Sequence, residues 1–377
     1  MKKNTEQKKI NPWPFCEEYS LKYQSLGEAA LAKREAALVT LAGGEGTRLG
    51  YDGPKGVFPI TLKTKKSLFE LFARKLLRLE KKCGAPIYWV LMLSLKNEKE
   101  TLAFFQKHNY FGLQKSQILF FTQQNLPYLD ENDQPIKNSA GKTLSGSNGN
   151  GALLEDIKTS KVLEKLKQAG VKYLQVVPVD NPIFNPLDPV FLGFHLEHKN
   201  DVSLIALKKE DGLNHMGALA EENKDQTKKL KIIEYLYLPK DITFSYVNSA
   251  LFLFNLEFIE KHSFADLPIH KVLKEVVLQK TENIDSLKNS NSLKNSKNQQ
   301  EQKDQKSQKN QQGPENRKEK KLKIYKSEKF IFDALDYAQK ASAIVYPRKE
   351  CFVPLKRVED LPVIQKIFLE KKDSIYL

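Results

Sequence analysis

The feature that most constrains this chain is a short apolar run followed at once by a cluster of glycines. Residues 37–41 (ALVTL) have the composition of a buried strand. The turn that follows contains closely spaced small residues, at Gly43, Gly44, Gly46 and Thr47. Such a turn can approach a ligand closely, and its N–H groups can bind phosphate oxygens. Because Arg48 and Lys55 add positive charge beside it, the stretch predicts a loop that binds a nucleoside triphosphate.

The spacing of the glycines excludes two common nucleotide-binding motifs. A Rossmann fingerprint requires a third glycine three residues after Gly46, where the sequence has Leu49. A P-loop ends in Gly-Lys-Ser or Gly-Lys-Thr, and the Gly-Lys-Thr at 141–143 has Ile136 where the motif requires its first glycine. The loop therefore belongs to another class of triphosphate site.

The alternation of predicted strands and helices indicates an α/β fold with a mostly parallel, Rossmann-like mixed sheet. Apolar runs predict strands, at residues 37–41, 87–92, 117–121, 171–181 and 202–207, with an antiparallel pair at 215–220 and 230–235. Helical spacing and helix-forming residues predict helices, at residues 26–33, 67–79, 97–108 and 152–168. We expect Ser67 with Glu70 to form a capping box, and Asn97 to cap the helix that follows it.

Composition favours a globular protein that acts on small anionic molecules. The chain has 377 residues, 40% of them hydrophobic, and a net charge of +15. Much of this charge lies within residues 285–323, so the remainder is mildly basic and nucleic acid is not the expected partner. Three cysteines without a C-x-x-C pair indicate a reducing, cytoplasmic compartment. No apolar run approaches the about 18 residues of a membrane span, so no membrane partner is expected.

Polar residues follow two of the predicted strands at their carboxyl ends, where open α/β sheets bind ligands. Gln123 follows the strand at 117–121, and Asp180 ends the strand at 171–181. Mg²⁺ is commonly held by one or two carboxylates together with substrate phosphates, which makes Asp180 a candidate ligand, although Asp-Asn-Pro is also ordinary turn chemistry. A second glycine-rich loop, at 145–151, precedes a predicted helix and could bind an anion or act as a linker.

Taken together, these segments resemble the sugar-nucleotide pyrophosphorylases, and most closely their UDP-N-acetylhexosamine branch. The resemblance rests on LAGGEGTRLG followed by PKG, and it continues in order through QQNLP at 123–127, NGNG at 148–151 and VDN at 179–181. It extends to EKFIFD at 328–333 and CFVPLK at 351–356, in which Phe330 and Phe332 alternate as on a strand. The fold it implies is that of the nucleotide-diphospho-sugar transferases, with a short C-terminal extension.

The resemblance also implies a role for individual residues. Arg48, Lys55 and Lys356 would bind phosphates during the reaction, and Asp180 would hold Mg²⁺. The nucleotide would be bound by the glycine loop and three further residues, Gln123, Gly149 and Asn150. The sugar would be bound by a glycine, a carboxylate and an amide, at Gly217, Glu234 and Asn248. The sequence departs from the family pattern at several of these motifs, with Gln124, Ser147, Asn148, Ala152, Leu251 and Phe252.

Four regions follow from the same comparison. An N-terminal arm (1–36) precedes a nucleotidyltransferase core (37–282), and the end of the core with its extension occupies 322–377. Between them, residues 283–321 are rich in Lys, Asn, Gln and Ser, with SLKNS repeated in tandem, and predict a disordered insertion. His195 and His198 have a spacing that could hold a metal, but no third ligand is evident and structural roles are expected.

The predicted reaction joins UTP to a hexose 1-phosphate, N-acetylglucosamine 1-phosphate in the first place, and gives a UDP-sugar and pyrophosphate. Two alternatives remain open from the sequence. Glucose 1-phosphate uridylyltransferases share the fold and most motifs, and the altered strand around Asn248 leaves the sugar undecided. A nucleotide-binding scaffold with a decayed site is the non-enzymatic alternative, against which Arg48, Lys55, Asp180 and Lys356 all argue.

Overall fold

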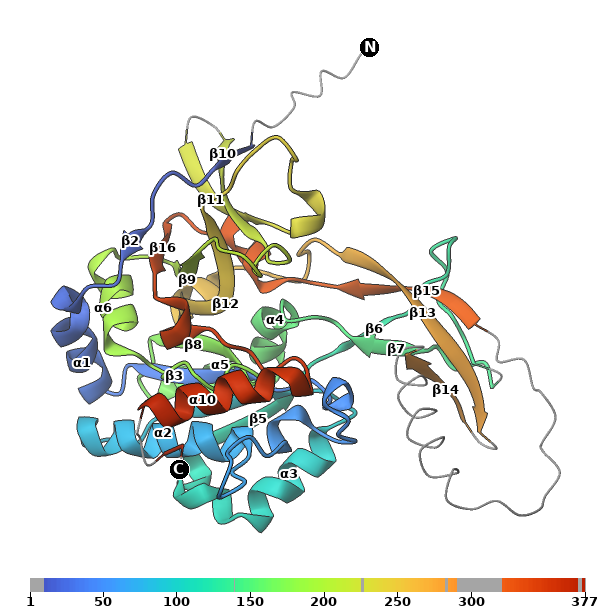
Figure 1. Cartoon of the computed structure of the whole chain (residues 1–377), viewed down its shortest axis with the longest axis horizontal. Coiled ribbons are helices and arrows are strands. Elements are labelled where there is room, and N and C mark those ends of the chain that lie inside the picture. Colours follow the sequence, from blue (N-terminus) through green and yellow to red (C-terminus); the bar gives the residue numbers. More distant parts are fainter. Residues whose placement is uncertain are drawn as a thin grey trace. The chain divides into compact units, whose positions relative to one another are not determined.

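The computed structural model describes residues 10–138, 140–224, 227–281, 284–289, 321–371 and 375–376 (Figure 1). The described chain forms two compact units. The first contains the residues up to Gln123, those from Gly151 to Leu267, and those from Ile331 onward. The second contains Gln124–Asn150 and the described residues between Pro268 and Phe330. Residues 124–150 of the predicted core at 37–282, and the described residues from 268 to its end, therefore belong to the second unit.

Four parallel strands form the half of the sheet that carries the glycine loop. They are β3 (Ala36–Leu41), β4 (Trp89–Leu93), β5 (Ile118–Thr122) and β8 (Tyr173–Pro178), in the order β8-β3-β4-β5. Leu41 pairs with Met92 on one side and with Pro178 on the other. Because the four strands are parallel and in register, the loops that leave their carboxyl ends emerge at one edge of the sheet.

The other half of the sheet is mixed, which agrees with the predicted fold class. The central member is β12 (Tyr246–Asn255), which runs antiparallel to β8 and to β9 (Val202–Lys208). Beyond β9, parallel pairing adds β16 (Ala341–Val345) and β2 (Glu17–Glu18). A side branch of antiparallel strands consists of β1 (Ile10–Pro12), β10 (Ala218–Lys224) and β11 (Thr227–Ile233).

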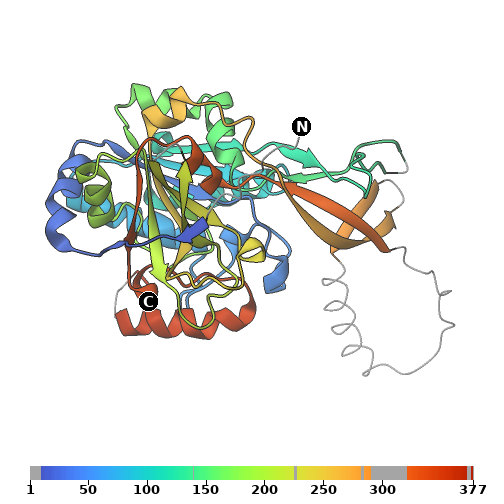
Figure 2. The ribbon, with the colours of Figure 1, turned by 90° about the horizontal axis from the view of Figure 1, so that it is seen from above.

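Helices cover both faces of this sheet. Figure 2 shows α4 (Ala152–Thr159), α5 (Val162–Gln168) and α7 (Leu256–Lys261) on one side, and α10 (Leu361–Lys371) on the other. The remaining long helices are α1 (Gln24–Ala32), α2 (Leu68–Cys83), α3 (Glu98–Lys107) and α6 (Pro189–Glu197). The core beneath α2 and α3 is aromatic, because fully buried Phe69, Trp89 and Phe105 pack together with ring centroids 5.0–6.4 Å apart. In the described residues no helix combines the length and apolar character needed to cross a membrane.

The second unit contains two small antiparallel sheets. The first pairs β6 (Asn125–Pro127) with β7 (Ser145–Ser147). The second has the order β14 (Ile284–Asn289), β13 (His270–Thr281), β15 (Lys321–Glu328). The strand at 284–289 lies inside the stretch 283–321, for which the sequence predicts disorder, and its residues pair with β13. Residues 283 and 290–320 of that stretch lie outside the described residues.

Several local expectations differ from the structure. The predicted helix at 152–168 is two helices, because the backbone at Lys161 turns left-handed with φ of 62°. Phe330 and Phe332 do not alternate on a strand, since β15 ends at Glu328 and residues 331–336 form a 3-10 helix. Ser67 does cap α2 by accepting from the Glu70 N–H, but the Glu70 carboxylate bonds to Arg74 rather than completing a capping box.

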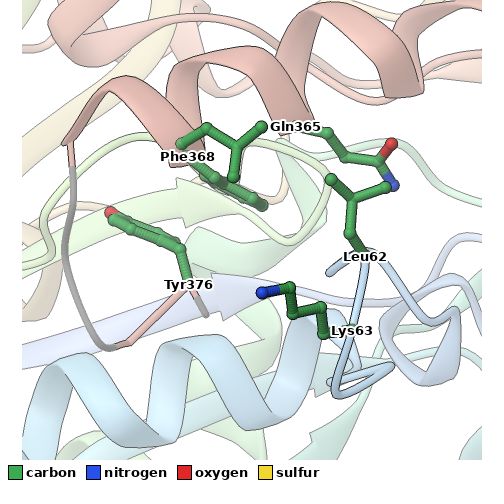
Figure 3. A pocket seen from close by; sticks show the side chains of 6 residues that line it. Leu62, Lys63, Gln365, Phe368 and Tyr376 are labelled. Carbon is green, nitrogen blue, oxygen red and sulfur yellow. The ribbon is translucent and has the colours of Figure 1, made fainter.

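The C-terminal extension packs against the loop that precedes α2. Figure 3 shows a small pocket at this contact, lined by Leu62, Lys63, Gln365, Phe368, Leu369 and Tyr376. The Gln365 side chain donates to the Ile60 carbonyl at 3.0 Å, and the Phe368 and Tyr376 rings stack with centroids 4.3 Å apart. None of the predicted site residues lines this pocket, and the contacts around it attach the C-terminal helix to the loop.

Candidate active site

The glycine loop is closed on itself by backbone hydrogen bonds. The Gly46 N–H donates to the Gly53 carbonyl at 2.9 Å, and the Lys55 N–H donates to the Gly44 carbonyl at 3.0 Å. Between them, residues 47–49 form a 3-10 turn that ends at Gly50, whose φ of 64° favours glycine. The sequence therefore specifies a compact loop in which Lys55 returns to the glycines that follow β3.

The outer surface of this loop is suited to an anion. Gly44, Thr47 and Arg48 are exposed, and a Cβ added at Gly44 would meet open space. Among the described residues, the N–H groups of Gly44 and Thr47 donate to no protein acceptor, and the Arg48 guanidinium has no partner. Unpaired N–H groups beside a cationic side chain can bind phosphate oxygens.

The structure brings Lys55, Asp180 and Lys356 together from three distant parts of the sequence. The Asp180 Oδ2 atom accepts from the Lys55 Nζ at 3.1 Å and from the Lys356 Nζ at 2.8 Å. The Asp180 side chain is buried, while half of the Lys356 side chain is exposed. The Asp180 Oδ1 atom is buried and has no hydrogen-bond partner. The group thus combines two cations with one free carboxylate oxygen.

The two lysines control the charge of this carboxyl group. Burial alone raises the pKa of Asp180, but the positive charges of Lys356 and Lys55, and the hydrogen bonds they donate, outweigh it and hold that pKa below its usual value. Asp180 is therefore ionised at neutral pH, although its side chain is removed from solvent.

Asn181 positions the segment that carries Lys356, a role that the sequence does not indicate. Its Nδ2 donates to the Cys351 carbonyl at 2.7 Å, and its Oδ1 accepts from the Val353 N–H at 3.3 Å. Next to it, the Asp180 carbonyl accepts from the Leu355 N–H at 2.7 Å. The Asp-Asn pair after β8 therefore binds the backbone of the segment at 351–355. This segment leads directly to Lys356 and brings its side chain to the Asp180 carboxylate.

Gln123 lies against the glycine loop. It follows β5 at the same edge of the sheet, and its side chain is buried. A Cβ added at Gly43 would lie 2.3 Å from the Gln123 Nε2 atom, so only glycine leaves room for the amide there. The Gln123 Oε1 atom is buried without a partner, as is expected of a group that bonds to a ligand.

The three predicted sugar-binding residues also lie together. The Asn248 N–H donates to the Gly217 carbonyl at 2.9 Å, because β10 and β12 pair at this point. The Glu234 Oε1 atom lies 3.5 Å from the position of a Cβ built on Gly217. Leu251 and Phe252, which depart from the family pattern, are fully buried core residues. A register shift in β12 after Asn248, with Ala250 at φ of 60°, separates them from the trio.

Gly149 and Asn150 belong to the second unit and are described within it. The backbone at Gly149 has φ of 85°, and a Cβ there would lie 2.4 Å from the Lys329 carbonyl oxygen. The Lys329 N–H donates to the Asn148 carbonyl at 2.8 Å. Glycine is therefore required at 149 by the packing of the loop on the segment after β15.

The two histidines of α6 have structural partners. The His195 ring bonds to the Ser203 Oγ at 2.9 Å and to the Asn255 Oδ1 at 3.0 Å, and burial lowers its pKa to about 4. The His198 Nε2 lies 3.1 Å from the Glu17 Oε2 and 3.2 Å from the Tyr23 hydroxyl. In the part of the chain that the structure describes, no group of three or more His, Cys, Asp or Glu residues is arranged to hold a metal.

A mostly parallel α/β sheet with a glycine loop and a lysine–carboxylate cluster at its carboxyl edge defines a nucleotide-binding α/β protein. Residues 1–376 match the family described as UTP–glucose-1-phosphate uridylyltransferase, and the chain belongs to that family. A Saccharomyces cerevisiae relative, "UDP-N-acetylglucosamine pyrophosphorylase", is 39% identical over 58% of this chain and 46% of its own length. A Dictyostelium discoideum relative, "Probable UDP-N-acetylglucosamine pyrophosphorylase", is 30% identical over 89% and 67%. The chain thus matches under half of the yeast protein and two thirds of the other.

Solved structures agree with the fold. The uridine diphosphate N-acetylglucosamine pyrophosphorylase of Trypanosoma brucei, solved with an inhibitor, superposes with a TM-score of 0.75. The alignment covers 96% of this chain and 73% of the other, at 23% identity. At that identity the likeness supports the predicted nucleotidyltransferase fold and not a shared substrate.

Proposed function

We propose that this protein transfers a uridylyl group from UTP to a sugar 1-phosphate, with N-acetylglucosamine 1-phosphate as the sugar substrate. The observation that carries the proposal is the buried Asp180 carboxylate bonded by Lys55 and Lys356 at the edge of the sheet that also carries the glycine loop. Two cations and unpaired N–H groups at one edge provide what a polyanionic substrate pair requires.

The chemistry needs charge neutralisation more than acid or base catalysis. One oxygen of the sugar phosphate forms a bond to the α-phosphorus of UTP, while the bond from that phosphorus to the pyrophosphate oxygen breaks and its electrons leave with pyrophosphate. The attacking oxygen is already anionic, so no proton has to be removed from it. Lys55 and the glycine loop bind the phosphates of the leaving group, and Lys356 binds the sugar phosphate.

We also propose that the site uses Mg²⁺, with Asp180 as its protein ligand. The buried, unpartnered Oδ1 atom of Asp180 supports this, because an ionised carboxylate oxygen is a preferred Mg²⁺ ligand. Substrate phosphates would complete the coordination, and the bound ion would neutralise phosphate charge. The cytoplasmic location predicted from the sequence is consistent with three free thiols, at Cys16, Cys83 and Cys351.

The choice of sugar rests on the relatives and on the trio around Gly217. Both curated relatives described above are named for UDP-N-acetylglucosamine. Gly217, Glu234 and Asn248 supply a carboxylate and an amide for sugar hydroxyls, and Leu251 and Phe252 do not interfere because both are buried in the core. The departures from the family pattern in β12 therefore lie outside this trio.

Pyrophosphate release tests the proposal directly. Purified protein is incubated with UTP, Mg²⁺ and, in separate reactions, N-acetylglucosamine, glucose and N-acetylgalactosamine 1-phosphates. We expect the highest kcat/KM with N-acetylglucosamine 1-phosphate. A preference for glucose 1-phosphate would reassign the sugar, and no release with any of the three would contradict the transferase activity and favour a nucleotide-binding scaffold.

A further inference from the structure

We propose that Asn97 is a positioning residue that holds the glycine loop in its anion-binding conformation before the nucleotide arrives. The proposal rests on the proposed function for its catalytic consequence. Asn97 occupies the N-cap position of α3, yet its side chain makes no capping hydrogen bond, contrary to the sequence-based expectation. It is almost fully buried, with 1% of its surface exposed, so its amide must find partners elsewhere.

Those partners connect the ends of two neighbouring strands. The Asn97 Nδ2 donates to the Ala42 carbonyl at 2.9 Å and, more weakly, to the Gly44 carbonyl at 3.4 Å. Its Oδ1 accepts from the Ser94 N–H at 2.9 Å, just after β4. One amide therefore bonds to carbonyl groups on both sides of Gly43 and fixes them to the segment that leaves the adjacent strand.

The carbonyl groups that Asn97 binds determine which side of the loop can accept an anion. The Gly44 carbonyl also accepts from the Lys55 N–H at 3.0 Å, so both of its bonds lie on the protein side. If the peptide at Gly44 were to rotate, its carbonyl oxygen would face the phosphates and repel them. Glycine allows this rotation more readily than any other residue, and Asn97 opposes it by bonding to the oxygen.

Neighbouring residues of the same segment reach the loop but bind it less firmly. The Lys96 Nζ lies 2.7 Å from the Glu45 Oε2, but the Lys96 side chain is 70% exposed, and exposed ion pairs contribute little. The Glu100 carboxylate lies against Gly53, where a Cβ would be 2.7 Å from its Oε1. Asn97 is the buried member of this group and accounts for the hydrogen bonds to the loop backbone.

The test replaces Asn97 with a side chain of the same shape. Asn97→Asp retains the acceptor for the Ser94 N–H but places an oxygen opposite the Ala42 carbonyl. We expect KM for UTP to rise about tenfold, as for the loss of one buried hydrogen bond, with a smaller change in kcat. Asn97→Ser provides a second, less disruptive variant should the aspartate prevent folding, with a smaller rise in KM for UTP expected.

Asn200→Asp is the matched control. Asn200 is fully buried, and its Nδ2 donates to the Ser203 and Ser342 hydroxyls at 2.9 and 2.6 Å, within the sheet at β9 and β16. This substitution also removes a buried amide donor, so thermal stability should fall as it does in Asn97→Asp. KM for UTP should remain that of the wild type. An equal rise in KM in both variants would reduce Asn97 to a general stability residue and overturn the proposal.

Hydrogen exchange of the nucleotide-free protein separates this proposal from the proposed function. We expect the Gly46, Leu49 and Lys55 N–H groups, which bond within the loop, to exchange faster in Asn97→Asp than in Asn200→Asp. Unchanged exchange in Asn97→Asp would overturn the positioning role whatever the activity. Faster exchange in Asn97→Asp would support the positioning role even if the wild-type protein turned over no sugar phosphate. In that case only the proposed transferase activity would be contradicted.

Discussion

The Nζ atom of Lys356 lies 2.8 Å from the Oδ2 atom of Asp180, although 176 residues separate them in the sequence. Lys55 bonds to the same oxygen from the other direction along the chain. The Asp180 carbonyl and the Asn181 side chain bind the backbone of the segment that leads to Lys356. These hydrogen bonds fix the position of that segment, and the contact between Lys356 and Asp180 follows from them.

Lys55→Ala should reduce turnover while the fold stays intact. Lys55 is mostly buried beside Asp180, so its charge acts in a site of low polarity, where loss of one such group reduces kcat about 10²–10³-fold. Pyrophosphate release measures the loss, and circular dichroism checks the fold. Lys63→Ala removes an exposed lysine of a nearby loop and should leave turnover unchanged. Wild-type turnover in Lys55→Ala would exclude this lysine from the reaction.

Lys356→Ala should raise KM for the sugar 1-phosphate more than KM for UTP. Its side chain is half exposed, so it can leave Asp180 for an incoming phosphate. We expect KM for the sugar 1-phosphate to rise about tenfold, the effect of losing one charged hydrogen bond. The control is Lys366→Ala on α10, whose side chain is 79% exposed. A larger change in KM for UTP would assign Lys356 to the nucleotide instead.

The stability of the protein towards acid should depend on the two lysines. They hold the pKa of Asp180 below its usual value, so the stability that this carboxylate contributes is present above the unfolded-state pKa and is lost as pH falls through the lower, folded-state pKa. With Lys55→Met and Lys356→Met combined, burial alone remains and raises that pKa.

In this double variant the sign reverses, because the ionised, buried carboxyl group destabilises the fold at neutral pH and stability recovers as pH falls through the raised folded-state pKa. Denaturant unfolding at a series of pH values, followed by circular dichroism, measures this dependence. Adding Asp180→Asn to the double variant should abolish the recovery because no carboxyl group remains at the position. A recovery that persists in the triple variant would place the titrating group elsewhere.

Gly44→Ala and Gly43→Ala should affect UTP for different reasons. A Cβ at Gly44 meets open space, so we expect unchanged thermal stability and a KM for UTP raised about tenfold by contact with the phosphates. A Cβ at Gly43 would displace the Gln123 amide and should therefore reduce discrimination between UTP and CTP. Unchanged KM in Gly44→Ala would show that no ligand approaches this glycine.

Lys75→Met should destabilise the fold strongly. The Lys75 Nζ is buried on α2 and donates to the carbonyls of Pro182 and Phe184, at 2.5 and 2.9 Å, in the turn after Asp180. Methionine fills a similar volume but leaves these acceptors unpaired, at a cost of about 2–4 kcal/mol. Denaturant unfolding measures the change, with exposed Lys81→Met as the control. A loss below 1 kcal/mol would mean that water replaces the ammonium group.

The placement of the candidate site residues could be predicted from the sequence more readily than the contacts that support them. Asp180 and Gln123 were chosen as candidates because parallel strands place their carboxyl ends at one edge, and that rule needs no knowledge of side-chain packing. The functions of Asn97 and Asn181 were not predicted, because their partners are backbone groups 53–55 and about 170 residues away and no local pattern marks them. Local rules assigned Asn97 to its own helix, whereas tertiary contacts determine its partners.

The residues on either side of 290–320 are held by a single strand. Asn289, the last residue of β14, pairs with Val276, and Lys321, the first residue of β15, pairs with the adjacent Val277. Since β13 holds Asn289 and Lys321 side by side, the free energy of joining these two ends varies only slowly with the number of residues between them. Residues 290–320 therefore mark the position at which a reporter domain or an affinity tag could be inserted without altering the strands that flank it.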